Sequence, residues 1–320
     1  MSIIGPIILL ATLVIGLAIA GPALLRRATP LLVRFPHRAI QLLPSGIILW
    51  LIGLLSIGPL LAWLTSGPVL LPKGAADVCQ QCIDAANPFG IERIATVIPT
   101  VLLFTVPGLF TIVFAAGLTR RMWKRNREIT DLAAVILAES NREHIAGYDV
   151  TVISDDQVHA YSLPANNGGI VLSRHALAAL STDELLAVLA HEQAHVSGRH
   201  HQLRTFMDSL VHLLGWVPLV RECGKILPGL LEIAADRHAQ QTAGTSAVVG
   251  ALITIGERKP LESGMLQMAG RERIQQLIAP VEGKAGILPA TTMALHVALL
   301  AGLGALVLPA YISALISGCL

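Results

Sequence analysis

The chain has 320 residues, of which 53% are hydrophobic and only 14% are charged. A soluble domain carries about 25% charged residues, so this composition excludes an ordinary soluble protein and indicates an integral membrane protein. The net charge of +2 is too small to argue for nucleic acid, and no basic stripe with interleaved aromatic residues is present. Four scattered cysteines are too few for a disulfide scaffold.

Four apolar stretches are long enough to cross a bilayer, which requires about 20 residues. They lie at about residues 3–25, 40–64, 94–118 and 290–316. We therefore expect three regions along the chain. A membrane region with three transmembrane helices covers residues 1–119, a more polar domain covers 120–286, and a C-terminal transmembrane helix covers 287–320.

Two arginine-rich segments indicate how these spans are oriented. The first lies between spans one and two and contains Arg26, Arg27, Arg34 and Arg38. The second follows span three and contains Arg120, Arg121, Lys124, Arg125 and Arg127. Because cytoplasmic loops collect Lys and Arg, both segments should face the cytoplasm. We therefore expect residues 120–286 in the cytoplasm and both termini outside. If one weak span lay flat on the membrane instead, one terminus would change sides.

The loop between spans two and three is expected outside and contains Cys79 and Cys82. In that compartment a short local disulfide is the simplest interpretation, and a redox or metal sensor is the alternative.

The polar domain has recognisable local elements. Ser181 to Glu184 form a capping box that predicts a helix start, and this helix continues past residue 195. The stretch 206–220 is apolar but too short and interrupted to span, so we expect an interfacial or packed helix there. Further helices are expected at 120–146 and 230–242, and short strands at 150–153, 159–163 and 169–172.

Residues 191–195 read His-Glu-Gln-Ala-His on the capped helix. Side chains four apart share a helix face, so His191 and His195 can both reach one Zn²⁺ ion. Glu192 projects beside the metal, where it can take a proton from zinc-bound water and return it to the leaving amine. This spacing predicts a zinc peptidase; the alternative is two surface histidines on an amphipathic helix.

A catalytic zinc site needs a third protein ligand, and two residues compete for that role. Glu232 begins the sequence Glu-Ile-Ala-Ala-Asp on a later helix, where Asp236 lies one turn beyond and can orient a ligating histidine. His201 is the alternative, because residues 191–201 also fit the pattern HExxHxxGxxH. We favour Glu232, since no persuasive Met-turn follows.

Three further histidines are accessory candidates. His200 and His201 are electrostatic or substrate-facing residues in one interpretation and a basic helix end in the other. His238, just past Asp236, could stabilise an oxyanion, although a solvated helix face is the simpler interpretation.

The motifs at 183–195, 198–201 and 232–237 resemble those of BlaR/MecR-type membrane zinc metallopeptidases, over roughly residues 120–280. The resemblance implies an α-helical multi-pass membrane protein with four transmembrane helices, whose mainly α, cytoplasmic, gluzincin-like peptidase domain carries a small β-sheet. It also implies one Zn²⁺ per chain and a place in a bacterial cell membrane.

The activity that the resemblance implies is cleavage of a protein substrate, either a BlaI/MecI-like transcriptional repressor or the protein itself. Expected partners are that substrate, the lipid bilayer and a second copy in a homodimer, with no direct nucleic-acid binding. No penicillin-binding module with a Ser-x-x-Lys nucleophile follows, so β-lactam sensing is not carried over. The alternatives are an HtpX-like quality-control protease, whose relatives usually carry spans between the two motifs, and a non-catalytic zinc-binding membrane receptor.

Overall fold

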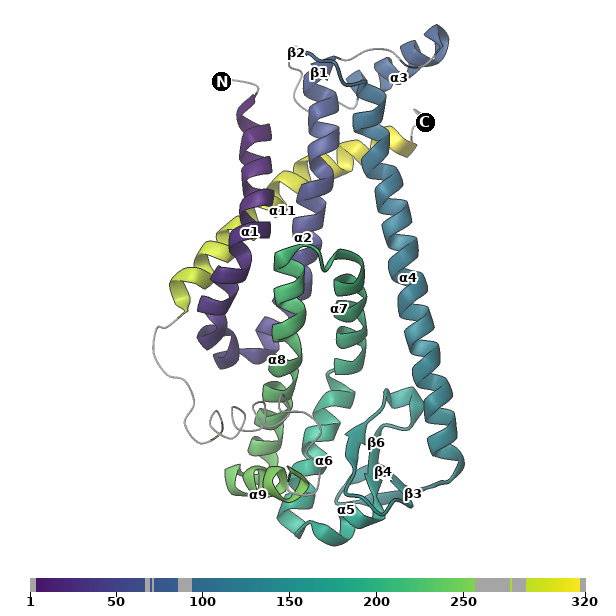
Figure 1. Ribbon diagram of the computed structural model, residues 1–320, viewed down its shortest axis with the longest axis vertical. Coiled ribbons are helices and arrows are strands. Elements are labelled where there is room, and N and C mark those ends of the chain that lie inside the picture. Colours follow the sequence, from purple (N-terminus) through teal and green to yellow (C-terminus); the bar gives the residue numbers. More distant parts are fainter. Residues whose placement is uncertain are drawn as a thin grey trace.

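The computed structural model describes residues 4–66, 70, 72–85, 94–256, 277 and 286–316. Within these residues, four helices are long and apolar enough to cross a membrane, as the sequence predicts. They are α1 (Ile4–Arg34), α2 (Pro36–Leu64), α4 (Thr100–Ala138) and α11 (Ile287–Ile316). In Figure 1, α1, α2 and α11 lie in the upper part of the molecule, and α4 extends from there to its lower part. The end of the expected polar domain, 257–276 and 278–285, lies outside the described residues.

The third span begins later than the sequence suggests. Ile94–Ala95 form strand β2, which pairs in parallel with β1 (Thr65–Ser66), and α4 starts at Thr100 after Pro99. Helix α3 (Lys73–Ala85) lies in the intervening loop; it carries Cys79 and Cys82, whose side chains lie outside the described part of the chain.

Helix α4 is one continuous helix of 39 residues that leaves the membrane region and runs down the side of the molecule (Figure 1). The predicted helix over 120–146 is therefore wrong at its end. Ser140–Ile145 instead form strand β3, because all six residues pair in antiparallel register with β4 (Tyr148–Ile153).

Strands β3 to β6 form the small mixed sheet, in the order β3-β4-β6-β5. β6 (Ile170–Ser173) pairs in parallel with β4 and antiparallel with the edge strand β5 (Ala160–Ser162). Apolar side chains of β4 and β6, including Val152 and Leu172, pack on Leu189 of α6. The sheet thereby supports the helix that carries the His-Glu motif.

The helices after the sheet are α5 (Arg174–Ala179), α6 (Thr182–Ser197), α7 (His200–Leu214), α8 (Pro218–Ala243) and α9 (Thr245–Gly256). The predicted capping box at the start of α6 is confirmed. The Ser181 amide donates to Glu184 Oε2 at 2.9 Å, and the Glu184 amide donates to Ser181 Oγ at 3.4 Å.

Helices α7 and α8 form an antiparallel hairpin whose turn lies beside α2 in Figure 1. Residues 206–220 contribute parts of both helices rather than one packed helix, because the chain reverses at Gly215 and Trp216. The hairpin buries a shared core with the membrane helices, in which Leu214 and Val220 join Leu17 of α1. The segment between the two sequence motifs is therefore packed against the membrane region.

Two polar contacts also link α8 to α1. Arg26 Nη1 lies 3.1 Å from Glu222 Oε1, and Arg237 Nη1 donates to the carbonyl oxygen of Arg34 at 2.7 Å. The second contact lies at the carboxyl end of α1, directly after Asp236 in the sequence.

Candidate metal centre

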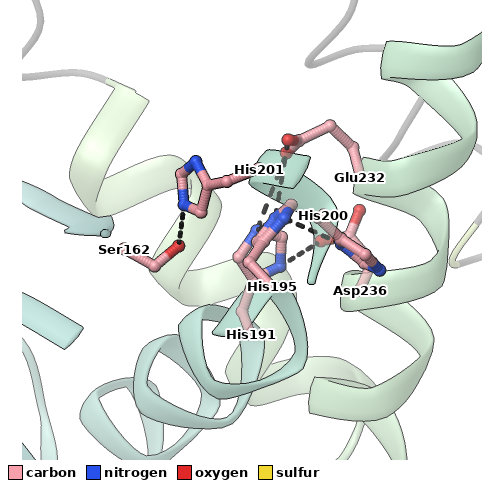
Figure 2. A network of polar contacts seen from close by, with 7 residues as sticks. All are labelled: Ser162, His191, His195, His200, His201, Glu232 and Asp236. Carbon is pink, nitrogen blue, oxygen red and sulfur yellow. Dashed lines mark hydrogen bonds and ion pairs between the residues drawn. The ribbon is translucent and has the colours of Figure 1, made fainter. Parts of the chain in front are cut away.

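His191 and His195 lie one turn apart on α6 and direct their Nε2 atoms toward each other, 3.2 Å apart (Figure 2). Glu232 approaches both from α8: its Oε2 lies 3.6 Å from His191 Nε2, and its Oε1 lies 3.6 Å from His195 Nε2. One donor atom from each of these three residues lies within 4.8 Å of the other two. Two helices therefore bring three ligand-type atoms to one point.

The spacing of this group fits a zinc ion. In a tetrahedral site with bonds of about 2.0–2.1 Å, neighbouring ligand atoms lie about 3.3–3.4 Å apart. The observed separations of 3.2 and 3.6 Å bracket that value. The donor set of two imidazoles and one carboxylate is also typical of catalytic zinc sites, which leave a fourth position for water or substrate.

Asp236 supports the group from the next turn of α8. Its Oδ1 lies 3.0 Å from His191 Nδ1, and the residue is 2% exposed. A carboxylate on the second ring nitrogen fixes the tautomer and orientation of a ligating histidine. The structure thus places Asp236 where the sequence predicts a residue that orients the site.

His200 and His201 point in different directions although they are adjacent at the start of α7. His200 Nδ1 lies 2.9 Å from His195 Nδ1, on the side of that ring away from Glu232. His201 Nε2 instead lies 3.4 Å from Ser162 Oγ on β5 (Figure 2). His201 is therefore not brought together with His191 and His195, whereas Glu232 is.

Burial and neighbouring charges separate the histidines in protonation. Burial lowers the pKa of His191, but hydrogen bonds to Asp236 and Glu232 outweigh this effect and raise it to about 9. Burial and then the charge of His191 lower the pKa of His195 to about 3, and burial is the main cause that lowers the pKa of His200 to about 4. At neutral pH the ring of His191 is therefore a cation, whereas the rings of His195 and His200 are neutral and carry one N–H each.

Glu192 follows His191 on α6 and is buried, with 9% of its surface exposed. Its negative charge is near enough to contribute to the raised pKa of His191. A carboxylate beside a metal group, rather than in it, is available for proton transfer. His238, by contrast, lies on an exposed part of α8, and the structure does not bring it to the group.

Comparison with known families provides the deciding observation. The model of peptidase family M48 matches residues 123–255, a segment from within α4 to the end of α9 that contains both sequence motifs. Residues 123–255 are thus similar to the peptidase domain of family M48. The protein is a metalloendopeptidase. No curated protein and no solved structure matches the chain.

Peptidases of family M48 depend on zinc, in agreement with the donor atoms that residues 123–255 bring together. The family match does not extend to the BlaR/MecR type, so that finer resemblance stays a prediction. The sequence did not assign a contact to His200 or to Arg237. Both residues lie in stretches that carry the family resemblance, 198–201 and 232–237, and His200 is an accessory candidate, but the sequence predicts no partner for either.

Proposed function

We propose that this protein is a membrane-bound zinc endopeptidase that hydrolyses a protein substrate, with His191, His195 and Glu232 as metal ligands and Glu192 as general base. The observation that carries the proposal is the spacing of three donor atoms from α6 and α8, which suits one tetrahedral zinc ion. The match to family M48 supports the reaction class.

A zinc ion held by His191, His195 and Glu232 would supply Lewis-acid polarisation of the attacking water and of the substrate carbonyl. Glu192 takes a proton from that water and delivers it to the leaving amine, so no covalent intermediate is needed. Asp236 holds His191 by its Nδ1 atom. The two ligand histidines are only 15% and 13% exposed in their side chains, whereas Glu232 is 36% exposed, which favours substrate entry on the side of Glu232.

The sheet supports binding of an extended substrate. β5 is an edge strand of the four-stranded sheet and packs beside α6. Extended peptides commonly pair with an exposed sheet edge, where main-chain hydrogen bonds provide affinity. We place the substrate chain along β5, with the bond to be cleaved beside Glu192.

We place the peptidase domain, residues 120–286, on the cytoplasmic side of a bacterial cell membrane, because the arginine-rich segments after spans one and three belong to the same side. The resemblance to BlaR/MecR-type proteins favours a regulatory role, in which the protein cleaves a BlaI/MecI-like repressor or itself.

An HtpX-like quality-control protease is the second candidate. The α7–α8 hairpin favours it, since this segment between the two motifs shares a buried core with α1 and α2. That packing brings the substrate site close to the membrane, where misfolded membrane proteins would be met.

The test of the catalytic proposal uses the full chain purified in detergent. Glu192→Gln should retain about one zinc per chain and lose at least about a hundredfold in peptide cleavage, because the amide cannot accept the proton. Glu232→Ala should lose the zinc, and His201→Ala should retain it. Unchanged cleavage in Glu192→Gln would contradict the role of Glu192 as general base, and a wild-type protein that holds zinc but cleaves no peptide would support the non-catalytic receptor instead.

Substrate profiling separates the regulatory and quality-control roles. Membrane and soluble proteins from cells with the wild-type protein are compared with those from cells with Glu192→Gln. One stabilised transcriptional repressor indicates regulated cleavage, whereas many stabilised membrane proteins indicate quality control.

A further inference from the structure

We propose that His200 is a positioning residue for the metal centre: it accepts a hydrogen bond from Nδ1–H of His195 and thereby fixes the ring in the orientation that presents Nε2 to the metal. This inference rests on the proposed role of His195 as a ligand. It assigns a specific task to a histidine that lies outside the His-Glu-Gln-Ala-His and Glu-Ile-Ala-Ala-Asp sequences.

The geometry around His195 supports this assignment. Its Nε2 lies 3.2 Å from His191 Nε2 and 3.6 Å from Glu232 Oε1, so this nitrogen faces the metal group. Its Nδ1 lies 2.9 Å from His200 Nδ1, and the two rings are nearly perpendicular, at 88°. Each nitrogen of His195 therefore has a defined neighbour.

The chemistry of a neutral imidazole determines the direction of the hydrogen bond. When Nε2 provides its lone pair to a metal, the ring carries its proton on Nδ1, which must donate. His200 Nδ1 can accept only if the proton of His200 lies on its own Nε2. A His195 ring protonated on Nδ1 and a His200 ring protonated on Nε2 together leave His195 Nε2 free for the metal and allow the hydrogen bond between the two Nδ1 atoms.

The break between α6 and α7 brings His200 into place. Helix α6 ends at Ser197 and is capped by Gly198. Arg199 then adopts a left-handed conformation with φ 51° and ψ 38°, and α7 starts at His200. This reversal turns the ring of His200 back onto the last turn of α6. A left-handed conformation is uncommon for a residue other than glycine, so tertiary contacts must hold it.

Gly198 leaves the space that the His200 ring occupies. A Cβ atom at this position would lie 2.5 Å from His200 Nε2 and 2.8 Å from the carbonyl oxygen of Ala194. Neither distance is tolerable, and the carbonyl belongs to the helix itself. The close approach of the ring to α6 therefore requires glycine at this position.

His200 is also buried, with 6% of its surface exposed. A polar ring is costly to bury without a partner, and its contact with His195 provides one. The arrangement matches the role of Asp236 on the other ligand histidine: α8 supports His191, and α7 supports His195. Three helices together thus determine where the two ring nitrogens point.

The test compares substitutions that retain or remove an acceptor near Nδ1. His200→Asn places an amide oxygen close to the original Nδ1, and His200→Leu has similar size without an acceptor. Zinc affinity is measured on the purified full chain by competition with a chelator, and Co²⁺ is used in parallel because its visible absorption reports ligand geometry. His212→Leu, an exposed position on α7, is the matched control.

We expect His200→Leu to weaken zinc binding about 10–100-fold and to change the Co²⁺ spectrum, because partners of ligand histidines typically contribute that much. His200→Asn should stay within about threefold of wild type with an unchanged spectrum, and so should His212→Leu. Equal losses in the Asn and Leu variants, or no loss in the Leu variant, would overturn the proposal.

A second variant covers the case in which His200→Leu does not fold. His200→Gln is polar, and its amide reaches the position of Nε2 rather than Nδ1, so it should bind zinc as weakly as expected for Leu. Wild-type affinity in this variant would contradict the proposal. If wild-type protein binds no zinc, the proposed function itself fails; normal zinc binding in both the wild-type and Leu proteins rejects the His200 inference alone.

Discussion

His191 is the ligand histidine that contacts two carboxylates. Its ring lies between the buried carboxylate of Asp236 and the more exposed one of Glu232, and both favour the imidazolium form. A proton and a zinc ion therefore compete for the same ring. This competition has a measurable consequence.

Zinc affinity should rise by up to about tenfold for each pH unit between pH 6 and pH 8, because Zn²⁺ must displace the proton that His191 retains below its pKa of about 9. The raised pKa sets the sign: higher pH removes the competitor. A histidine with an ordinary pKa of about 6.5 would give an affinity that levels off above about pH 7. Chelator competition at constant ionic strength measures this dependence.

Asp236→Asn is the matching variant for that measurement. Loss of the carboxylate removes a main cause of the raised pKa of His191, so the pH dependence should flatten toward pH 8. Overall zinc affinity should also fall about 10–100-fold, since the ring loses its partner. Identical slopes in the variant and wild type would contradict the assigned electrostatics.

The sequence predicted those site residues whose relative positions follow from helix periodicity. The spacing of His191 and His195 alone places both rings on one face, and a Glu followed four residues later by Asp does the same for Glu232 and Asp236. The contact of His200 depends on the backbone of Arg199, whose left-handed conformation no side-chain pattern signals. Sequence analysis therefore offered His200 as an electrostatic or substrate-facing residue, or as part of a basic helix end, but could not predict its contact with His195.

Among the elements, the strand that the sequence missed has a clear physical explanation. β3 reads Ser-Asn-Arg-Glu-His-Ile and has no buried side chain, so it lacks the apolar alternation that predicts a strand. Its conformation comes from pairing with β4, whose Val150 and Val152 are buried. The start of α6, by contrast, was predictable because the capping box is a local signal.

The crossing of α2 and α4 depends on one small residue. A Cβ atom at Gly58 would lie 2.4 Å from Pro107 Cγ and 2.5 Å from the carbonyl oxygen of Leu103. Close helix packing in membranes commonly uses glycine in this way. Gly58→Ala should therefore push the helices apart and reduce the stability by about 1–3 kcal/mol, measured by thermal unfolding in detergent.

Gly46→Ala is the control on the same helix, because no neighbouring atom lies within 4 Å of a Cβ atom there. It should leave the unfolding temperature unchanged or slightly raised, since alanine is a better helix former than glycine. If both substitutions lowered stability equally, the loss could not be assigned to the α2–α4 crossing.

On the scale of the whole molecule, the peptidase region and the membrane helices share one buried core. In this core α8 packs on α1 and α2, and α7 packs on α4 and α8. The buried side chains from the hairpin include Met207, Leu210, Leu214, Leu219, Val220 and Leu227. Composition indicated where the spans lie, but it could not show this packing. The hairpin is amphipathic, and its apolar side could equally well have faced lipid or protein.

An excised fragment of residues 120–286 should consequently aggregate in buffer without detergent, because removal of α1 and α2 exposes the apolar side of the hairpin. The full chain should stay monodisperse in detergent. Size-exclusion chromatography of both proteins tests this expectation. A soluble, monomeric and zinc-binding fragment would show that the proposed domain 120–286 is independent of the membrane helices.

The length of α8 determines how far the metal group lies from the membrane. Leu213, near the turn of the hairpin, lies beside Gly117 of α4. Gly117 precedes Arg120, the first arginine of the arginine-rich segment after span three, by three residues. The turn therefore lies at the expected boundary between lipid and water. Glu232 lies 14 residues beyond Pro218 along α8, a rise of about 21 Å. A substrate anchored in the same bilayer would therefore need a tether of about six extended residues between its anchor and the bond that is cut.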